Sequence, residues 1–177
     1  DGNKVGSKNG RAGQGKITYF MMSKVWSVFG LTNTIDDPEK FFLMGKCILP
    51  KYVPAMDNNP AYKYHAFISD YKPFPDGDDQ PIPYEDVETI EKFRNVFSIS
   101  RKLGQSGTSW VIPFPKHIPK ESELVVAVIK FYFYSILRER LTVKIGETSI
   151  NKDTISKLAR KYLPSEDADF YEFIKEA

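Results

Sequence analysis

The residues best suited to chemistry are glycines near the start of the chain. Residues 10–15 have the sequence Gly-Arg-Ala-Gly-Gln-Gly, a G-x-x-G-x-G pattern. Ile17, Phe20 and Met21 follow at helical spacing and predict a helix over 14–24. Glycines let a backbone approach a ligand closely, and a helix N-terminus offers unpaired N–H groups and a positive dipole end. The combination favours a phosphate site, although a flexible loop over 1–14 that binds no ligand explains the glycines equally well.

Two common phosphate-binding patterns do not fit these glycines. A dinucleotide fold needs G-x-G-x-x-G after an apolar strand, and no apolar strand precedes Gly10. A Walker loop ends in Gly-Lys-Ser/Thr, whereas Ile17 follows Gly15 and Lys16 here. Both patterns are therefore excluded for this segment.

A Gly-Thr pair, Gly107 and Thr108, opens the second strand of a predicted hairpin. β-Branched and aromatic residues predict strands over 96–101 and 108–114, joined by a glycine-containing turn over 103–107. Alone, a glycine before a β-branched run is only a turn entering a strand. The pair gains meaning from its order in the chain, after a glycine loop, a helix and several strands.

This order resembles the second half of the Bergerat ATP-binding fold, found in the GHKL superfamily of gyrase-type topoisomerases, ninety-kilodalton heat-shock chaperones, histidine kinases and mismatch-repair ATPases. The resemblance covers much of 10–146. It implies binding of ATP with Mg²⁺, and a lid loop over 1–15 that couples nucleotide binding to a conformational change. The residues that would bind the nucleotide are Gly10, Gly13, Gln14, Gly15, Lys16, Gly107 and Thr108.

The resemblance also implies that part of the ATPase machinery lies elsewhere. In the family, a helix with a general-base Glu and a metal-binding Asn precedes the lid, as does a strand with D-x-G-x-G. Neither can be placed after Gly10. We therefore expect a carboxy-terminal piece of a larger ATPase domain, which fits the missing initiator methionine. Alone it would be inactive, with no catalytic residue assigned.

Length and periodicity predict the fold. The chain has 177 residues, 41% of them hydrophobic and 14% aromatic, enough for a substantial core. We expect an α/β protein, a two-layer α+β sandwich with a mixed, mainly antiparallel sheet packed against helices. Domain one would span 1–146, and 147–177 would form a helical extension. The predicted strands cover 25–32, 41–49, 64–69, 141–145 and 148–150, and the predicted helices cover 84–93, 121–137, 151–162 and 166–176.

Two segments carry further expectations. Prolines and an acidic turn over 76–79 make 50–83 mostly loop apart from one strand. The helix over 121–137 has an unusually broad apolar stripe and is expected to lie deep in the core, with Ser122 as its cap.

Other reactive residues predict no site. His65 and His117 lack metal-ligand spacing, and Cys47, the only cysteine, resembles a small buried apolar residue. The acidic turn fits no calcium loop. No metal site is therefore predicted within the chain itself.

Charge and hydropathy limit the partners. The net charge of +2 does not point to a nucleic-acid partner, although a local basic patch would still allow one. No apolar stretch approaches the ~20 residues of a membrane-spanning helix. We expect a cytoplasmic protein without a membrane partner. The alternative to an ATPase is a non-enzymatic module that binds protein or nucleic acid through the proline-rich middle or the basic helix over 151–162. A homodimer or a protein partner remains open under either hypothesis.

Overall fold

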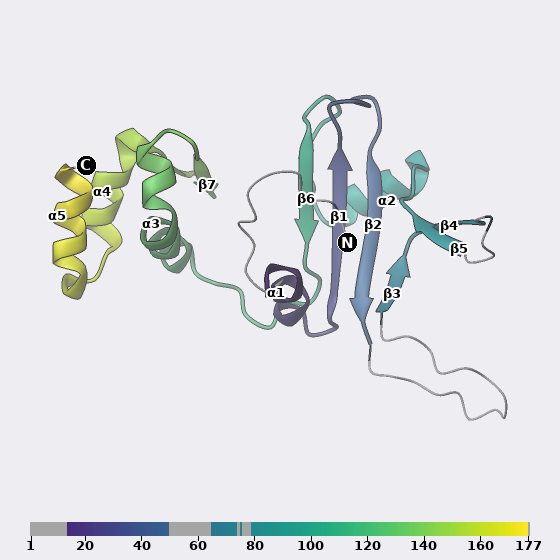
Figure 1. Cartoon of the computed structure of the whole chain (residues 1–177), viewed down its shortest axis with the longest axis horizontal. Helices are drawn as coiled ribbons and strands as arrows, with labels where there is room; N and C mark the ends of the chain where they lie inside the picture. Colours follow the sequence, from purple (N-terminus) through teal and green to yellow (C-terminus); the bar gives the residue numbers. More distant parts are fainter. Residues whose placement is uncertain (1–13, 50–64, 74, 76–78, 177) are drawn as a thin grey trace. The chain divides into compact units, whose positions relative to one another are not determined.

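The computed structural model describes residues 14–49, 65–73, 75 and 79–176, and it forms two compact units, 1–117 and 118–177 (Figure 1). The domain boundary expected after residue 146 falls inside the second unit. The helix over 121–137 and the strand after it, expected in the first domain, belong to this second unit. Helices pack on antiparallel sheets, so the expected α+β sandwich is confirmed.

A four-stranded sheet organises the first unit. Its order is β3-β2-β1-β6, formed by β1 (Ser27–Asn33), β2 (Phe42–Ile48), β3 (His65–Ile68) and β6 (Gly107–Val111) (Figure 1). Every pairing in it is antiparallel. The register places Gly30 of β1 opposite both Met44 of β2 and Trp110 of β6. A second sheet of two short, mostly exposed strands, β4 (Asp70–Pro73) and β5 (Asp79–Ile82), lies in the segment expected to be loop.

One face of the four-stranded sheet is covered by α2 (Val87–Val96), and we call it the helix face. Because side chains alternate along a strand, Phe29 and Leu31 of β1 point to this face. Leu31 is buried with Ile90 of α2, and the ring of Phe29 packs against that of Phe93 with centroids 5.3 Å apart. The apolar side of α2 therefore completes the core of this unit.

The predicted hairpin is wrong in its first strand. Residues 96–101 form no strand, because α2 continues to Val96 and its end is closed by the Ile99 N–H, which donates to the Arg94 carbonyl (2.9 Å). Phe97 then packs against Phe93 with ring centroids 4.7 Å apart, so the aromatic residues that predicted a strand extend the helix core instead. The second strand exists as β6, but it pairs with β1 rather than with 96–101.

Asp86 caps α2 and makes its stability depend on pH. The Asp86 carboxylate accepts a hydrogen bond from the Thr89 backbone N–H at 2.8 Å. Hydrogen bonds from the Thr89 side chain and then its backbone lower the pKa of Asp86 below the ordinary 3.8. Because the folded pKa is the lower one, this stabilisation is present above the ordinary pKa and is lost as pH falls through the folded pKa.

We predict that Asp86→Asn weakens this dependence on acid. The neutral amide still caps a helix, since Asn and Asp are both good N-caps, but it does not titrate. Denaturant unfolding of both proteins between pH 6 and pH 2.5 checks the prediction. The free energy of unfolding of the wild type should fall more steeply below the ordinary carboxyl pKa of 3.8. Parallel curves would show that the cap contributes no pH dependence.

The second unit is built on α3 (Glu121–Leu137), as the sequence predicts. The hairpin of β7 (Val143–Ile145) and β8 (Thr148–Ile150) follows, with Gly146 at a φ of 54° in its turn. Next come α4 (Lys152–Tyr162), the short 3-10 helix η1 (Ser165–Asp167) and α5 (Ala168–Glu176). Asn151 caps α4, as expected from the sequence, by accepting from the Asp153 and Thr154 N–H groups. The buried core consists of Val125, Ile129, Ile136, Ile150, Ile155, Ala159 and Ile174.

Only one side of α3 is buried. Ile129 and Ile136 are fully buried, but Phe131 and Tyr134 on the other side are largely exposed. The expectation of a helix deep in the core is therefore half right. The N-cap is Lys120 rather than Ser122, because the Glu123 carboxylate accepts from the Lys120 backbone N–H. No helix in the described part of the chain is long and apolar enough to cross a bilayer.

Candidate functional site

A groove of about 750 Å³ lies on the sheet face opposite α2, which we call the groove face. Alternation along the strands directs Gly30 and Thr32 of β1 and Thr108 of β6 to this face. Residues of α1 (Gln14–Met22) line it as well. The lining is mainly apolar and consists of Tyr19, Phe20, Val28, Gly30, Thr32, Phe42, Met44, Gly45, Lys46, Phe67, Pro83, Thr108 and Trp110.

A stack of aromatic rings forms one wall of the groove. The rings of Tyr19 from α1 and Trp110 from β6 have centroids 5.2 Å apart and are 13° from parallel. The indole lies against Gly30, since a Cβ built on that glycine would be 3.3 Å from Trp110 Cζ3. Gly30 thus leaves room for the indole to pack against β1. Trp110 remains 55% exposed, so much of its surface is open to a ligand.

The polar groups of the groove include two threonine hydroxyls and one ammonium. The hydroxyls of Thr32 and Thr108 face each other across β1 and β6 at 3.0 Å. The Lys46 ammonium lies 5.1 Å from the centre of the Phe67 ring on the neighbouring strand. An apolar cleft with a few converging polar groups is the usual form of a small-molecule site.

The structure describes some of the predicted site residues, and one of them lines the groove. Gly10 and Gly13 lie outside the described residues. The backbones of Gln14, Gly15 and Lys16 form the start of α1. Gly107 and Thr108 are the first residues of β6, and Thr108 lines the groove. The helix after the glycine motif and the strand after the Gly-Thr pair therefore contribute to one groove, although about 90 residues separate them.

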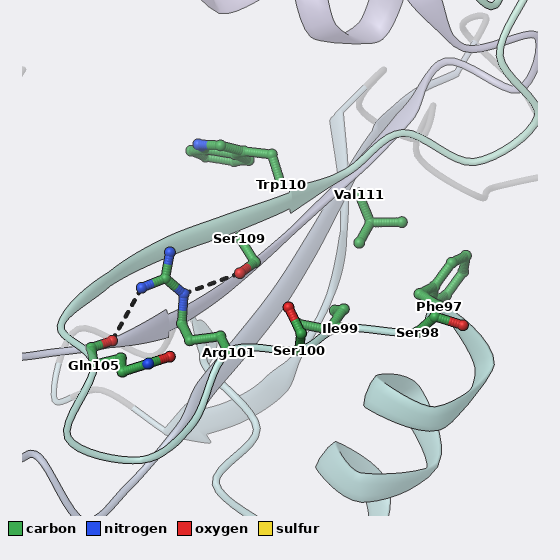
Figure 2. Close-up of a pocket in the computed structure, with 9 residues that line it drawn as sticks. All are labelled: Phe97, Ser98, Ile99, Ser100, Arg101, Gln105, Ser109, Trp110 and Val111. Carbon is green, nitrogen blue, oxygen red and sulfur yellow. Dashed lines mark hydrogen bonds between the residues drawn. The ribbon is translucent and has the colours of Figure 1, made fainter. Parts of the chain in front are cut away.

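A second, more polar pocket of about 450 Å³ lies on the helix face of β6 (Figure 2). Its lining includes Arg101, whose guanidinium donates to the Ser109 hydroxyl and to the Gln105 carbonyl. Figure 2 shows Trp110 projecting from the opposite side of β6. Successive residues of one short strand thus serve two different pockets.

Comparison with family models, with curated proteins and with solved structures found no match for this chain. Function therefore has to be argued from the groove itself.

The remaining candidate residues form no site. Cys47 is buried, as expected. His65 belongs to β3 and His117 to the segment after β6. Across the described ranges, no three His, Cys, Asp or Glu side chains are placed to hold a metal ion.

Sequence reasoning missed several residues of the groove and the polar pocket. Trp110 and Tyr19 were assigned to a strand and a helix without a role, because their contact depends on how α1 packs on the sheet. Lys46 lies in a largely apolar predicted strand, and nothing in the sequence assigns it a role. The sequence predicts Arg101 at the end of a strand, although its place just before a turn rich in glycine and polar residues is a usable signal for contacts with backbone carbonyls.

Proposed function

We propose that the first unit is part of an ATP-binding domain of the GHKL type, with the base of the nucleotide in the groove. The observation that supports this proposal is that one groove is lined both by the helix after the first motif, G-x-x-G-x-G, and by the strand that the second motif, Gly-Thr, begins. The resemblance to the Bergerat fold implies this arrangement, which the order of residues alone does not require.

The chemistry of the groove suits a purine ring. Aromatic and aliphatic side chains offer a flat apolar surface, and stacking on an exposed aromatic ring is favourable for any base. The paired hydroxyls of Thr32 and Thr108 both donate and accept, so they can satisfy the polar edge of a base. The described residues include no assigned general base, so the proposal covers binding and not hydrolysis by this chain alone.

A titration with ATP tests the proposal. Trp26 is first replaced with phenylalanine, which leaves Trp110 as the single tryptophan. ATP is then added to millimolar concentration while fluorescence is excited near 297 nm, where adenine does not absorb. We expect saturable quenching of Trp110, because a base in the groove contacts the indole. No change in Trp110 emission, together with no heat in a calorimetric titration, would contradict ATP binding by this unit.

We predict that Thr108→Val weakens ATP binding roughly tenfold, as expected for loss of one hydrogen bond to the ligand. Valine keeps the shape of threonine but cannot donate or accept. Ser100→Ala is the matched control, because it also removes one hydroxyl but lines the polar pocket rather than the groove. The affinity of each variant is measured by the same quenching. Equal affinities for Thr108→Val and the control would show that this hydroxyl does not contact the nucleotide.

One observation favours a second candidate function, the binding of single-stranded nucleic acid. The exposed indole of Trp110 and the Lys46 ammonium on the same sheet face could stack on a base and pair with a phosphate. This candidate predicts that a short oligonucleotide quenches Trp110 and that its affinity falls steeply with salt. If ATP and the oligonucleotide compete for the groove only at low salt, that result would favour nucleic-acid binding over ATP binding as the function of this unit.

A further inference from the structure

Arg101 makes an unusually complete set of contacts around the start of β6. Its Nε donates to the Ser109 hydroxyl at 3.0 Å. Nη1 donates to the carbonyls of Gln105 and Ser106 at 3.0 and 3.1 Å, and Nη2 donates to the Thr108 carbonyl at 3.4 Å. All four acceptors are neutral oxygens from one turn and the strand that follows it. Figure 2 shows the guanidinium between the turn and β6.

The backbone of Gly107 shapes the place that the guanidinium occupies. Gly107 has a φ of 129°, in the region that favours glycine. A Cβ on this residue would lie 3.0 Å from Arg101 Nη1, so the guanidinium fills the space beside it. The Gly-Thr pair therefore has a structural partner on the helix face, and this partner is Arg101.

The main chain around Arg101 is anchored independently of its side chain. The Arg101 carbonyl accepts from Arg94 Nη2 of α2 at 2.8 Å. The Gly104 N–H donates to the Pro38 carbonyl at 2.9 Å, and that carbonyl also accepts from the buried Asn33 side chain. The far side of the turn is thus tied to α2 and to the loop after β1. The start of β6 is paired with β1 on one side, and in the described hydrogen bonds the Arg101 side chain is what reaches it from the turn segment.

We propose that Arg101 is a positioning residue that fixes the start of β6 and so holds the Thr108 hydroxyl in the groove. Arg101 touches the Thr108 carbonyl and the Ser109 hydroxyl from the helix face, while the Thr108 hydroxyl points to the groove face. Without the guanidinium, the turn loses two hydrogen bonds and β6 loses two, so we expect the first residues of β6 to separate more readily from β1. The consequence for ligands rests on the proposed nucleotide site, but the effect on the strand does not.

Two variants and one control separate these effects. Arg101→Ala removes all four bonds, and Arg101→Lys keeps the charge but replaces the planar fork with a single ammonium that cannot span the same acceptors. Lys102→Ala changes the adjacent exposed residue, whose side chain makes none of these bonds. Circular dichroism first establishes that each variant is folded. If Arg101→Ala does not fold, Arg101→Lys alone is compared with the control.

Hydrogen exchange of the full chain tests the positioning directly. We expect at least about a tenfold faster exchange of amides over 104–109 in Arg101→Ala, a smaller increase in Arg101→Lys and none in Lys102→Ala. Amides of β2, two strands away, should exchange at wild-type rates. Exchange over 104–109 that is unchanged in both Arg101 variants would overturn the proposal, as would equal acceleration throughout the sheet.

The ATP titration then tests the link to the groove. We expect Arg101→Ala to lower the affinity for ATP roughly tenfold, measured by quenching of Trp110 at a temperature where the variant is folded. Accelerated exchange with wild-type ATP affinity would overturn the role of Arg101 in the site. If the wild-type chain does not respond to ATP, the proposed function fails, while the exchange result still decides whether Arg101 holds the strand.

Discussion

Replacing Gly45 with alanine is expected to destabilise the first unit by about 3 kcal/mol, the upper part of the range for overpacked interiors. Gly45 lies on β2 opposite Phe29 of β1. A Cβ on it would lie 2.5 Å from Phe29 Cε1 and 3.0 Å from Ile68 Cβ, so an aromatic ring occupies the place of its side chain. Phe29 cannot move aside freely, because it packs against Phe93 of α2. The added side chain must displace the ring and disturb the contact between sheet and helix.

Gly30→Ala is the matched control for this substitution. Gly30 is also a glycine in a central strand, but its nearest neighbour to a Cβ is Trp110 Cζ3 at 3.3 Å, part of a half-exposed side chain that can shift. We expect a change of less than about 1 kcal/mol, because alanine also lowers the entropy of the unfolded chain. Tryptophan fluorescence during urea unfolding measures both, since Trp26 and Trp110 both lie in the first unit. Equal midpoints for the two variants would contradict the packing described for Phe29.

Ile129→Ala is expected to cost the second unit about 3 kcal/mol, within the range for truncating a buried isoleucine. Ile129 is fully buried in the core beneath α3. Ile136, on the same face of α3, and Ile155 of α4 belong to the same buried cluster. Truncation leaves a cavity among side chains that come from different helices, so the site cannot collapse easily. Loss of the ellipticity at 222 nm in urea follows the unfolding of this largely helical unit.

Phe131→Ala on the same helix should have almost no effect on the second unit. Phe131 is 79% exposed, so its removal forfeits little buried surface, and alanine has the higher helix propensity. The pair Ile129→Ala and Phe131→Ala therefore separates the buried side of α3 from its exposed side. A large loss of stability for Phe131→Ala would mean that this side is covered in solution.

The elements set by local signals could be predicted from the sequence. The Asn151 cap and the periodic residues after it predicted α4, and the β-branched run before Asn33 predicted β1. The hairpin over 96–114 could not be predicted correctly, because Phe97 satisfies a strand pattern and a helix end equally well. Its packing on Phe93 decides the matter, and that contact depends on tertiary structure.

Part of the candidate site could also be predicted from the sequence, and part could not. Thr108 was expected in a nucleotide site because the Gly-Thr pair and the glycine loop together resemble the Bergerat fold, and it lines the groove. Local sequence does not predict the stack of Tyr19 on Trp110 or the hydrogen bonds of Arg101, because these contacts join residues from separate elements. The division into compact units depends on tertiary contacts in the same way, because the core beneath α3 closes on residues that follow that helix.

Arg101 has one more effect, on the behaviour of β6 at the end of the sheet. In the described sheet β6 is an edge strand, and its sequence Gly-Thr-Ser-Trp-Val contains no charge and no proline, the residues that usually keep such edges from pairing with other molecules. The guanidinium already takes the carbonyls of Gln105, Ser106 and Thr108, so an incoming strand does not find these acceptors free. A single arginine from the neighbouring turn thus occupies backbone acceptors at the start of an edge strand that carries no charge of its own.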